Sequence, residues 1–321
     1  MGAKRAVKGS IAPAAKTAPG DAAVGPPATQ GPLSKKTSQA KSDPTIGLAF
    51  GGGGARGFAH IHVIAALEDL GLAPACISGT SIGSIMGAGL AAGMDARQMQ
   101  DHVLDIFTDA REVISRFWQM RPSSVSEFLR GPRTMLGNVD AVKAVRAFLP
   151  GAVPANFQDL KTPLQVVATD FYAHAEVVIG EGDLYQAIGA SCALPAVMRP
   201  VTRDGVILVD GGMQNAVPYE LLFDKADVII GVDVVGGPIS NGRDLPTRFE
   251  AITGASQLLM QATTRLKCQQ FPPNLLLRPP VHGIGVLNFI AARTILEQTA
   301  HFRDEAKREI ERLLESEAAS A

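Results

Sequence analysis

A serine placed between two glycines is the strongest chemical signal in this sequence. The run Gly79-Thr80-Ser81-Ile82-Gly83 fits the pattern G-x-S-x-G, in which a sharp strand-to-helix turn exposes a serine nucleophile. Glycines two residues before and two after the serine leave room that so tight a turn would deny to side chains. A helix beginning at this serine also directs its amides and positive dipole end at whatever the serine attacks. An ordinary glycine-rich loop fits the same five residues, so the neighbouring elements must decide.

The residues on either side of the motif supply the strand and the helix that the turn needs. Ala75 to Ser78 is an apolar run typical of a buried strand, and Ile82 to Leu90 is typical of a buried helix. Both lie in an uncharged stretch, Leu70 to Met94, that is long enough to cross a bilayer. Because Pro74 and six glycines interrupt that stretch, a buried strand followed by a buried helix explains it better than a membrane span.

A second glycine-rich loop, residues 51–57, lies between a predicted strand at 45–50 and a predicted helix at 58–70. Its Gly-x-Gly-x-x-Gly spacing fits a dinucleotide fingerprint, which also requires an acidic residue near the end of the second strand. That strand ends Ile77-Ser78-Gly79, without an acid. A phosphate-binding P-loop requires Gly-Lys-Ser/Thr, whereas this loop continues Gly57-Phe58-Ala59. Both nucleotide interpretations therefore lack a residue that they need.

The same loop also suits an anion that is not a nucleotide. Consecutive glycines before a helix expose several backbone amides to one point, which favours negative charge. With a nucleophilic serine on the adjacent strand, that anion is the tetrahedral oxyanion of acyl transfer, and Gly52, Gly53 and Gly54 are its candidate donors. A purely structural tight turn is the alternative.

A serine nucleophile needs a proton acceptor, and the sequence offers two. Asp210 follows a predicted strand at 206–209, at the edge where a parallel sheet gathers its site. An aspartate in this position is also a common helix cap or turn former. Among the six histidines, His282 would complete the order serine, acid, histidine of α/β-hydrolases.

Three motifs taken together point to a family. The chain combines Gly52-Gly53-Gly54-Ala55-Arg56-Gly57, Gly79-Thr80-Ser81-Ile82-Gly83 and Asp210-Gly211-Gly212, and in this order they resemble the patatin-like phospholipase family. Ala168-Thr169-Asp170 and Ala190-Ser191-Cys192-Ala193-Leu194-Pro195 add to the resemblance, which covers roughly residues 45–240.

The resemblance implies a serine–aspartate dyad rather than a triad. Ser81 would be the nucleophile, Asp210 the base, and the amides at 52–54 an oxyanion hole with Arg56 beside it. The family also implies a central, mostly parallel α/β sheet flanked by helices, no cofactor or metal, and a lipid or other acyl ester as substrate.

The order of the predicted elements independently indicates the same fold class. The chain opens as strand, glycine loop, helix, strand, serine turn and helix, the alternation of a parallel sheet covered by helices. Further strands are expected at 164–169, 175–179, 206–209, 228–234 and 274–277. Further helices are expected at 95–107, 110–120, 140–149, 183–191, 218–225, 246–270 and 291–316.

Two segments are expected to lie outside the packed part of the domain at 45–321. Residues 1–44 are basic and rich in Ala, Pro, Lys, Gly and Ser, without the apolar core of a secretory signal, so we predict a disordered tail. Attraction of this tail to anionic lipid surfaces is a weaker alternative to a solubilising role. The segment 108–150 is a candidate lid, because much of it lacks a clear period.

The composition limits the classes of partner and the compartment that we expect for this protein. The 321 residues carry a formal net charge of −1, which argues against a nucleic-acid binder held by bulk charge. Three scattered cysteines fit a reducing compartment, so we expect a cytoplasmic protein that can contact membranes peripherally.

Together these patterns predict a serine lipid acyl hydrolase that works through an acyl-serine intermediate. Two rivals stay open: a dinucleotide-dependent oxidoreductase, disfavoured by the missing acid, and a catalytically silent regulatory or membrane-associated protein with the same fold. The sequence does not distinguish phospholipid, lysophospholipid and neutral lipid substrates, and it does not set the oligomeric state.

Overall fold

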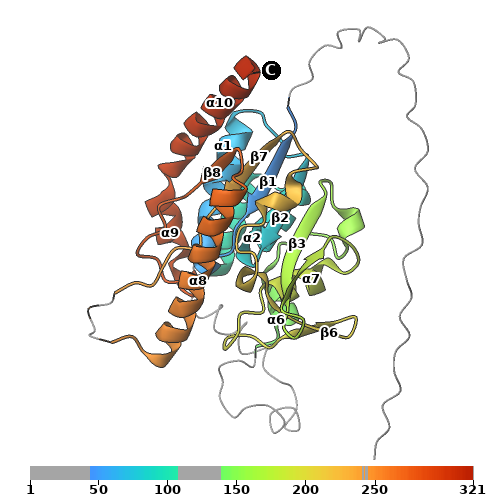
Figure 1. Cartoon of the computed structure of the whole chain (residues 1–321), viewed down its shortest axis with the longest axis vertical. Helices are drawn as coiled ribbons and strands as arrows, with labels where there is room; N and C mark the ends of the chain where they lie inside the picture. The colour runs from blue at the N-terminus through green and yellow to red at the C-terminus, as the bar shows by residue number, and fades with distance from the viewer. Residues whose placement is uncertain (1–43, 108–138, 241, 243–244, 321) are drawn as a thin grey trace, which may run out of the picture. The chain divides into compact units, whose positions relative to one another are not determined.

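A mixed eight-stranded sheet forms the centre of the molecule, in the order β5-β6-β3-β2-β1-β7-β8, with β4 paired to β3 (Figure 1). The computed structural model describes residues 44–107, 139–240, 242 and 245–320. The strands are β1 (Ile46–Phe50), β2 (Cys76–Thr80), β3 (Leu164–Asp170), β4 (Ala175–Ile179), β5 (Val201–Arg203), β6 (Val206–Asp210), β7 (Val228–Val232) and β8 (Leu275–Leu277). Strands β1, β2, β3, β7 and β8 pair in parallel, whereas β4, β5 and β6 join antiparallel. The predicted α/β class is confirmed.

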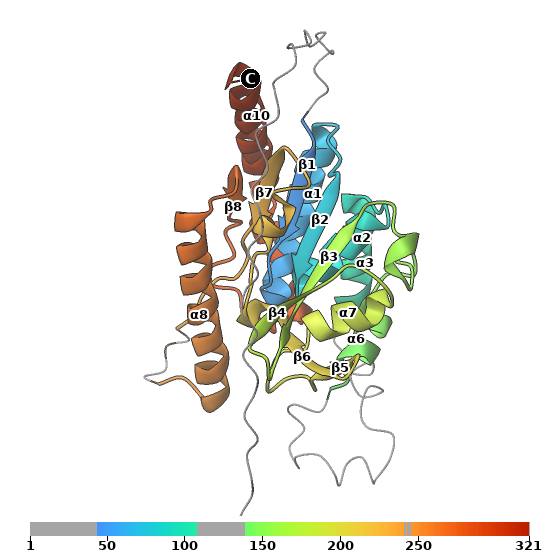
Figure 2. The same cartoon turned by 45° about the vertical axis from the view of Figure 1, so that its right-hand side comes forward.

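Helices cover both faces of this sheet (Figure 2). The α-helices are α1 (His60–Asp69), α2 (Ile82–Ala91), α3 (Ala96–Phe107), α6 (Ala141–Phe148), α7 (Leu184–Ser191), α8 (Arg248–Gln270), α9 (Ala292–Thr299) and α10 (Phe302–Ser320). Short 3-10 helices are η1 (Gly54–Ala59), η2 (Phe157–Asp159), η3 (Gly211–Met213), η4 (Tyr219–Leu222) and η5 (Phe289–Ala291).

The side chains of β1 alternate between two apolar clusters, one on each face of the sheet. Leu48 and Phe50 point into the larger core, which they share with α1 and α2, while Ala49 belongs to a smaller cluster on the other face. This alternation follows from the period of two in a strand. Buried on both faces, the central strands consist almost entirely of apolar and small residues. The smaller cluster includes residues of η4, with Met260 of α8 packed against it.

Several predicted elements differ from the observed ones. The predicted helix at 218–225 is only the 3-10 turn η4, and the predicted helix at 291–316 is divided into α9 and α10. The division falls at 300–301, where the chain turns so that Phe302, 3% exposed, enters the core. Strand β5 was not predicted; its three residues complete a hairpin with β6. The proposed tail, the predicted helix at 110–120 and most of the candidate lid lie outside the described residues, whereas α6 lies within the 108–150 segment.

The uncharged stretch 70–94 folds as predicted from its glycines. It contains β2, the serine turn and α2, all within the domain. In the described part of the chain, no helix has both the length and the hydropathy needed to cross a membrane.

Candidate active site

Ser81 occupies a strained turn between β2 and α2. Its backbone angles, φ 52° and ψ −124°, lie outside the regions that non-glycine residues favour. A Cβ atom at Gly79 would lie 2.6 Å from the Gly83 carbonyl oxygen, and one at Gly83 would lie 2.2 Å from the Phe50 carbonyl oxygen. Side chains at either glycine would therefore push the turn apart. The result is a serine held clear of its own backbone at the carboxyl end of a central strand.

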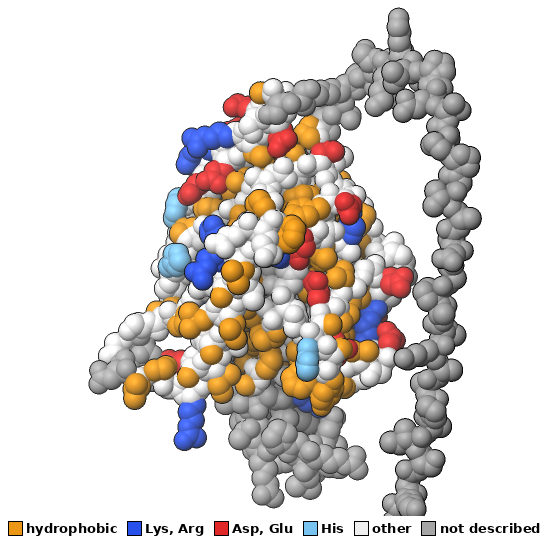
Figure 3. Space-filling model, viewed as in Figure 1, with side chains coloured by type: hydrophobic (Ala, Val, Ile, Leu, Met, Phe, Trp, Pro, Cys, Tyr) orange, Lys and Arg blue, Asp and Glu red, His pale blue; other side chains and the backbone are white. Residues whose placement is uncertain are grey.

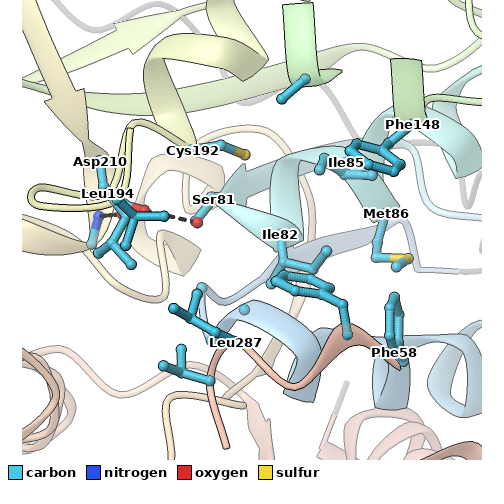
Figure 4. Close-up of a pocket in the computed structure, with 18 of the residues that line it drawn as sticks. Phe58, Ser81, Ile82, Ile85, Met86, Phe148, Cys192, Leu194, Asp210 and Leu287 are labelled. Atoms are coloured by element: carbon cyan, nitrogen blue, oxygen red, sulfur yellow. Dashed lines mark hydrogen bonds between the residues drawn. The ribbon is translucent and has the colours of Figure 1, made fainter. Parts of the chain in front are cut away.

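The structure brings Ser81 and Asp210 into direct contact, although they are 129 positions apart in the sequence. The Ser81 hydroxyl donates a hydrogen bond of 2.8 Å to Oδ2 of Asp210 (Figure 4). The other carboxylate oxygen, Oδ1, accepts the Gly212 amide at 2.8 Å. One oxygen is thus fixed by the backbone, and the other is aimed at the serine.

Burial makes Asp210 a better base than a solvated aspartate. The residue is 3% exposed, and desolvation raises the pKa of its carboxyl group to about 6. The hydrogen bonds from Gly212 and Ser81 act in the opposite direction, because they favour the charged form. The carboxylate therefore stays ionised at neutral pH but holds a proton more tightly than usual.

Two further contacts fix the serine and the aspartate in place. The Ser191 hydroxyl accepts the backbone amide of Ser81 at 2.7 Å, and Ser191 itself is fully buried. The Thr169 hydroxyl donates to the backbone carbonyl of Asp210 at 3.0 Å. Both partners belong to motifs that carried the family resemblance, but the sequence alone did not assign them these contacts. They explain how a strained turn and a strand end keep their alignment.

The glycine loop lies beside Ser81 and lines the same cavity. Gly52, Gly53 and Gly54 all line that cavity. The Gly52 amide is already used, because it donates to the Ala216 carbonyl at 2.9 Å. Within the described part of the chain, the amides of Gly53 and Gly54 have no acceptor. The predicted set of three donors is therefore reduced to two.

Arg56 does not line the cavity. It is 1% exposed, and its guanidinium donates to the carbonyls of Ile284 at 2.7 Å, Gly237 at 2.8 Å, and Val235. The predicted position beside the oxyanion donors thus serves a structural purpose: Arg56 joins two distant loops behind the glycine loop. Three of its five N–H groups are thus bound to carbonyls, and the side chain is buried away from the cavity.

The histidines lie apart from the serine and the aspartate. His282 is an exposed loop residue outside the cavity lining, so the alternative order serine, acid, histidine is not realised in space. His60 is fully buried under the glycine loop, with Nε2 bonded to the Gly51 carbonyl at 2.9 Å, and burial lowers its pKa to about 4. His102 reaches the cavity wall, where Nε2 bonds to the Phe148 carbonyl. In the described chain, no group of three or more His, Cys, Asp or Glu has a metal-binding arrangement.

An apolar cavity of about 170 Å³ extends from the Ser81–Asp210 pair. Figure 4 shows Ser81 and Asp210 on one side of it, and Ile85, Met86 and Phe148 on the other. Phe58 also lines it and packs against Phe107 and Phe289. Met86 of α2 lines the cavity, whereas Leu90 of the same helix and Met94 after it do not. The cavity fits a hydrocarbon chain that ends at the serine.

Gln257 of α8 is a buried polar residue in this lining. Its side chain is 8% exposed, and its amide oxygen has no hydrogen-bond partner among the described residues. By contrast, the Ser256 hydroxyl bonds to the Ile252 carbonyl of its own helix at 3.1 Å. A buried polar atom without a partner costs about 1–3 kcal/mol. We therefore expect Gln257→Leu to raise the free energy of unfolding by about 1 kcal/mol.

Urea denaturation of the folded chain measures this change, and Ser256→Ala is the matched control. The control removes a satisfied hydroxyl on the same cavity wall and should not stabilise the chain. A Gln257→Leu variant that unfolds at lower urea than wild type would show that the amide oxygen is paired in solution.

The comparison of this chain with known proteins points to one family. The family model for patatin-like phospholipases matches residues 48–223, which include the end of β1, the glycine loop, the serine turn and Asp210. An uncharacterized NTE family protein of Mycobacterium tuberculosis is 34% identical over 208 residues, 63% of this chain and 52% of that protein. Human patatin-like phospholipase domain-containing protein 6 is 32% identical over 216 residues, 65% of this chain and 14% of that protein. Lysophospholipase nte1 of Aspergillus fumigatus is 26% identical over 279 residues, 76% of this chain and 17% of that protein. This chain thus spans about half the length of the mycobacterial relatives and a smaller part of the others.

Proposed function

Because this chain belongs to the patatin-like phospholipase family, we propose that it hydrolyses carboxylic esters of lipids with Ser81 as nucleophile and Asp210 as general base. The observation that carries the proposal is the 2.8 Å hydrogen bond between these two side chains at the end of an apolar cavity. The bond is within the reach that proton transfer requires.

In the proposed first half-reaction, Oγ of Ser81 attacks the ester carbonyl carbon while Oδ2 of Asp210 takes the hydroxyl proton. The carbonyl oxygen becomes an oxyanion, and its proposed donors are the Gly53 and Gly54 amides, which line the cavity and have no acceptor in the described part of the chain. One such donor contributes roughly 3–4 kcal/mol to lowering the barrier. The tetrahedral intermediate then collapses, the alcohol leaves with the proton from Asp210, and an acyl-serine remains.

In the second half-reaction, a water molecule replaces the alcohol. Asp210 accepts a proton from the water, the resulting hydroxide attacks the acyl carbon, and the Ser81 oxygen leaves with that proton. The products are a fatty acid and the free enzyme. A single carboxylate thus serves both steps as base and then acid, which its raised pKa favours.

The apolar cavity and the names of the relatives indicate which substrate class to test first. The apolar wall at Ile85, Met86 and Phe148 suits one acyl chain. One relative is named as a lysophospholipase, so lysophosphatidylcholine is the first substrate to test. The test is release of free fatty acid from lysophosphatidylcholine, diacyl phosphatidylcholine and triacylglycerol, with the Ser81→Ala chain as blank. Equal release by both chains for all three lipids would overturn the proposal.

Features of the same site disfavour the two alternative functions, a dinucleotide-dependent oxidoreductase and a catalytically silent regulatory protein. Gly52 of the glycine loop lies against Ser81, and β2 ends without the acid that a dinucleotide ribose requires. A silent regulatory protein has no need of a buried carboxylate bonded to a strained serine, whose arrangement costs stability. Labelling of the serine separates this second rival from an enzyme.

The pH dependence of the reaction should report the Asp210 carboxyl. Only the ionised form accepts a proton, and its pKa is raised to about 6. We therefore expect kcat/KM to fall about tenfold per pH unit below pH 6 and to reach a plateau above pH 7. The measurement is the hydrolysis of a soluble short-chain nitrophenyl ester between pH 4.5 and pH 8. A midpoint near pH 4, the value of a solvated aspartate, would contradict the desolvated base.

A further inference from the structure

Helix α8 has two opposite faces with different surroundings. Thr253, Gln257 and Met260 of one face line the catalytic cavity. The other face carries a stripe of exposed apolar side chains, which we call the α8 stripe. Its members are Ile252, Ala255, Leu258, Leu259 and Leu266.

The α8 stripe is continuous along the helix. Ile252, Leu259 and Leu266 are seven residues apart in turn, so they lie nearly on one line, and the other two members lie beside it. The four large side chains are 54–68% exposed, which leaves them open to solvent among the described residues. In the view of Figure 3, hydrophobic side chains gather over the part of the molecule where Figure 1 places α8. A contiguous apolar surface of this kind marks an interaction site.

Helix α8 is capped at its amino end and bonded to the rest of the domain near its carboxyl end. A capping box between Thr247 and Glu250 closes its amino end. Near its carboxyl end, Nζ of Lys267 donates to Oδ1 of Asn215 at 2.6 Å and to Oε2 of Glu220 at 2.5 Å. The carboxyl end of the helix that carries the α8 stripe is therefore attached to the domain.

The charges of α8 favour an anionic lipid surface as the occupant. Arg248 and Arg265 are exposed and project to the same half of the helix as the stripe, at 100° per residue. The sole acid of α8, Glu250, belongs to the capping box. Exposed leucine and isoleucine beside arginine that is unpaired among the described residues suit an anionic lipid surface, which takes up apolar side chains and attracts cations.

The cavity rim supports the same occupant. Leu287 both lines the cavity and is 38% exposed, and nearby Ile290 is 52% exposed. An apolar rim lets an acyl chain that leaves a lipid layer enter the cavity with less contact with water. We propose that the α8 stripe, flanked by Arg248 and Arg265, docks this enzyme on anionic lipid surfaces. The inference deepens the lipid hydrolase function proposed above and rests on it for the identity of the substrate.

Vesicle cosedimentation tests the docking without catalysis. The full chain carrying Ser81→Ala is mixed with vesicles of phosphatidylcholine and phosphatidylglycerol in equal amounts, or of phosphatidylcholine alone. Adding Ile252→Glu and Leu259→Glu should weaken binding to the mixed vesicles about tenfold or more, because apolar burial is lost and charge is introduced. Arg265→Glu should weaken binding to the mixed vesicles only.

Val178→Glu is the matched control, since Val178 is also an exposed apolar residue, on β4 and outside the stripe. It should leave binding unchanged, and every variant carries the same amino-terminal segment. Hydrolysis of a soluble short-chain ester, measured with Ser81 present, should be equal in stripe and control variants. Failure of that hydrolysis in all chains, with vesicle binding intact, would overturn the proposed chemistry and leave the docking surface standing.

Three outcomes would overturn the docking surface. The first is equal vesicle binding by the stripe variant and the parent chain. The second is a dimer in size-exclusion chromatography that the stripe substitutions dissociate, which would assign the stripe to a second copy. The third is a parent chain that stays monomeric and binds neither vesicle.

Discussion

Asp210→Asn lowers kcat for ester hydrolysis by about 10³-fold, because an amide cannot accept the Ser81 proton. Ser81→Ala has a larger effect, on the order of 10⁶-fold, since the covalent path is lost altogether. The two losses should not add, because both residues act in the same step and the double variant loses no more than Ser81→Ala alone. The measurement is steady-state release of fatty acid or nitrophenol by the three variants and wild type.

The control for Asp210→Asn is Asp183→Asn. Asp183 caps α7, with its carboxylate bonded to the Gln186 amide at 2.8 Å, and asparagine caps a helix equally well. This control should keep wild-type kcat. We expect Asp210→Asn to unfold at least as high in temperature as wild type, since it removes a buried charge. Full activity in a folded Asp210→Asn variant would remove the aspartate from the mechanism.

Gly54→Ala should be the most damaging change in the glycine loop. Gly54 has φ +60°, and a Cβ atom there would lie 2.0 Å from the Val286 carbonyl oxygen. Neither the backbone angle nor the space tolerates alanine, so the loop must shift and move its two free amides. Loss of one oxyanion donor lowers kcat by about 10²-fold to 10³-fold. Steady-state kinetics on the soluble ester should show this loss mainly in kcat rather than in KM.

Gly71→Ala isolates the backbone contribution. Gly71 has nearly the same angle, φ +67°, but a Cβ atom there would meet nothing within 4 Å. Gly71 follows the carboxyl end of α1, outside the glycine loop. This control should cost about 1 kcal/mol of stability and leave kcat unchanged. If Gly54→Ala behaves like Gly71→Ala, the loop does not hold the oxyanion.

The parts of the site that the sequence could predict are those carried by local patterns. The strand-turn-helix around Ser81 and the strand before Asp210 follow from apolar runs bounded by glycines, and parallel packing then places both at one sheet edge. The two side chains do meet there, at 2.8 Å. Their catalytic roles stay predictions.

The parts that could not be predicted depend on contacts between distant segments. The Gly52 amide is occupied by Ala216, and Ser191 holds the Ser81 amide, 110 positions away. From the sequence, Arg56 is predicted to be a cation beside an anion site. In the structure its guanidinium instead binds three carbonyls that lie 179 to 228 positions further along the chain. No local period or motif encodes such pairings, because each depends on how loops meet after the sheet has formed.

Labelling with a fluorophosphonate probe tests the central claim most directly. The probe forms a covalent bond only with a serine whose proton a neighbouring base can take. Mass spectrometry of the labelled wild-type chain should place the adduct on the peptide containing Ser81, with labelling absent in Ser81→Ala and strongly slowed in Asp210→Asn. An unlabelled wild-type chain, or an adduct on any other serine, would contradict the account.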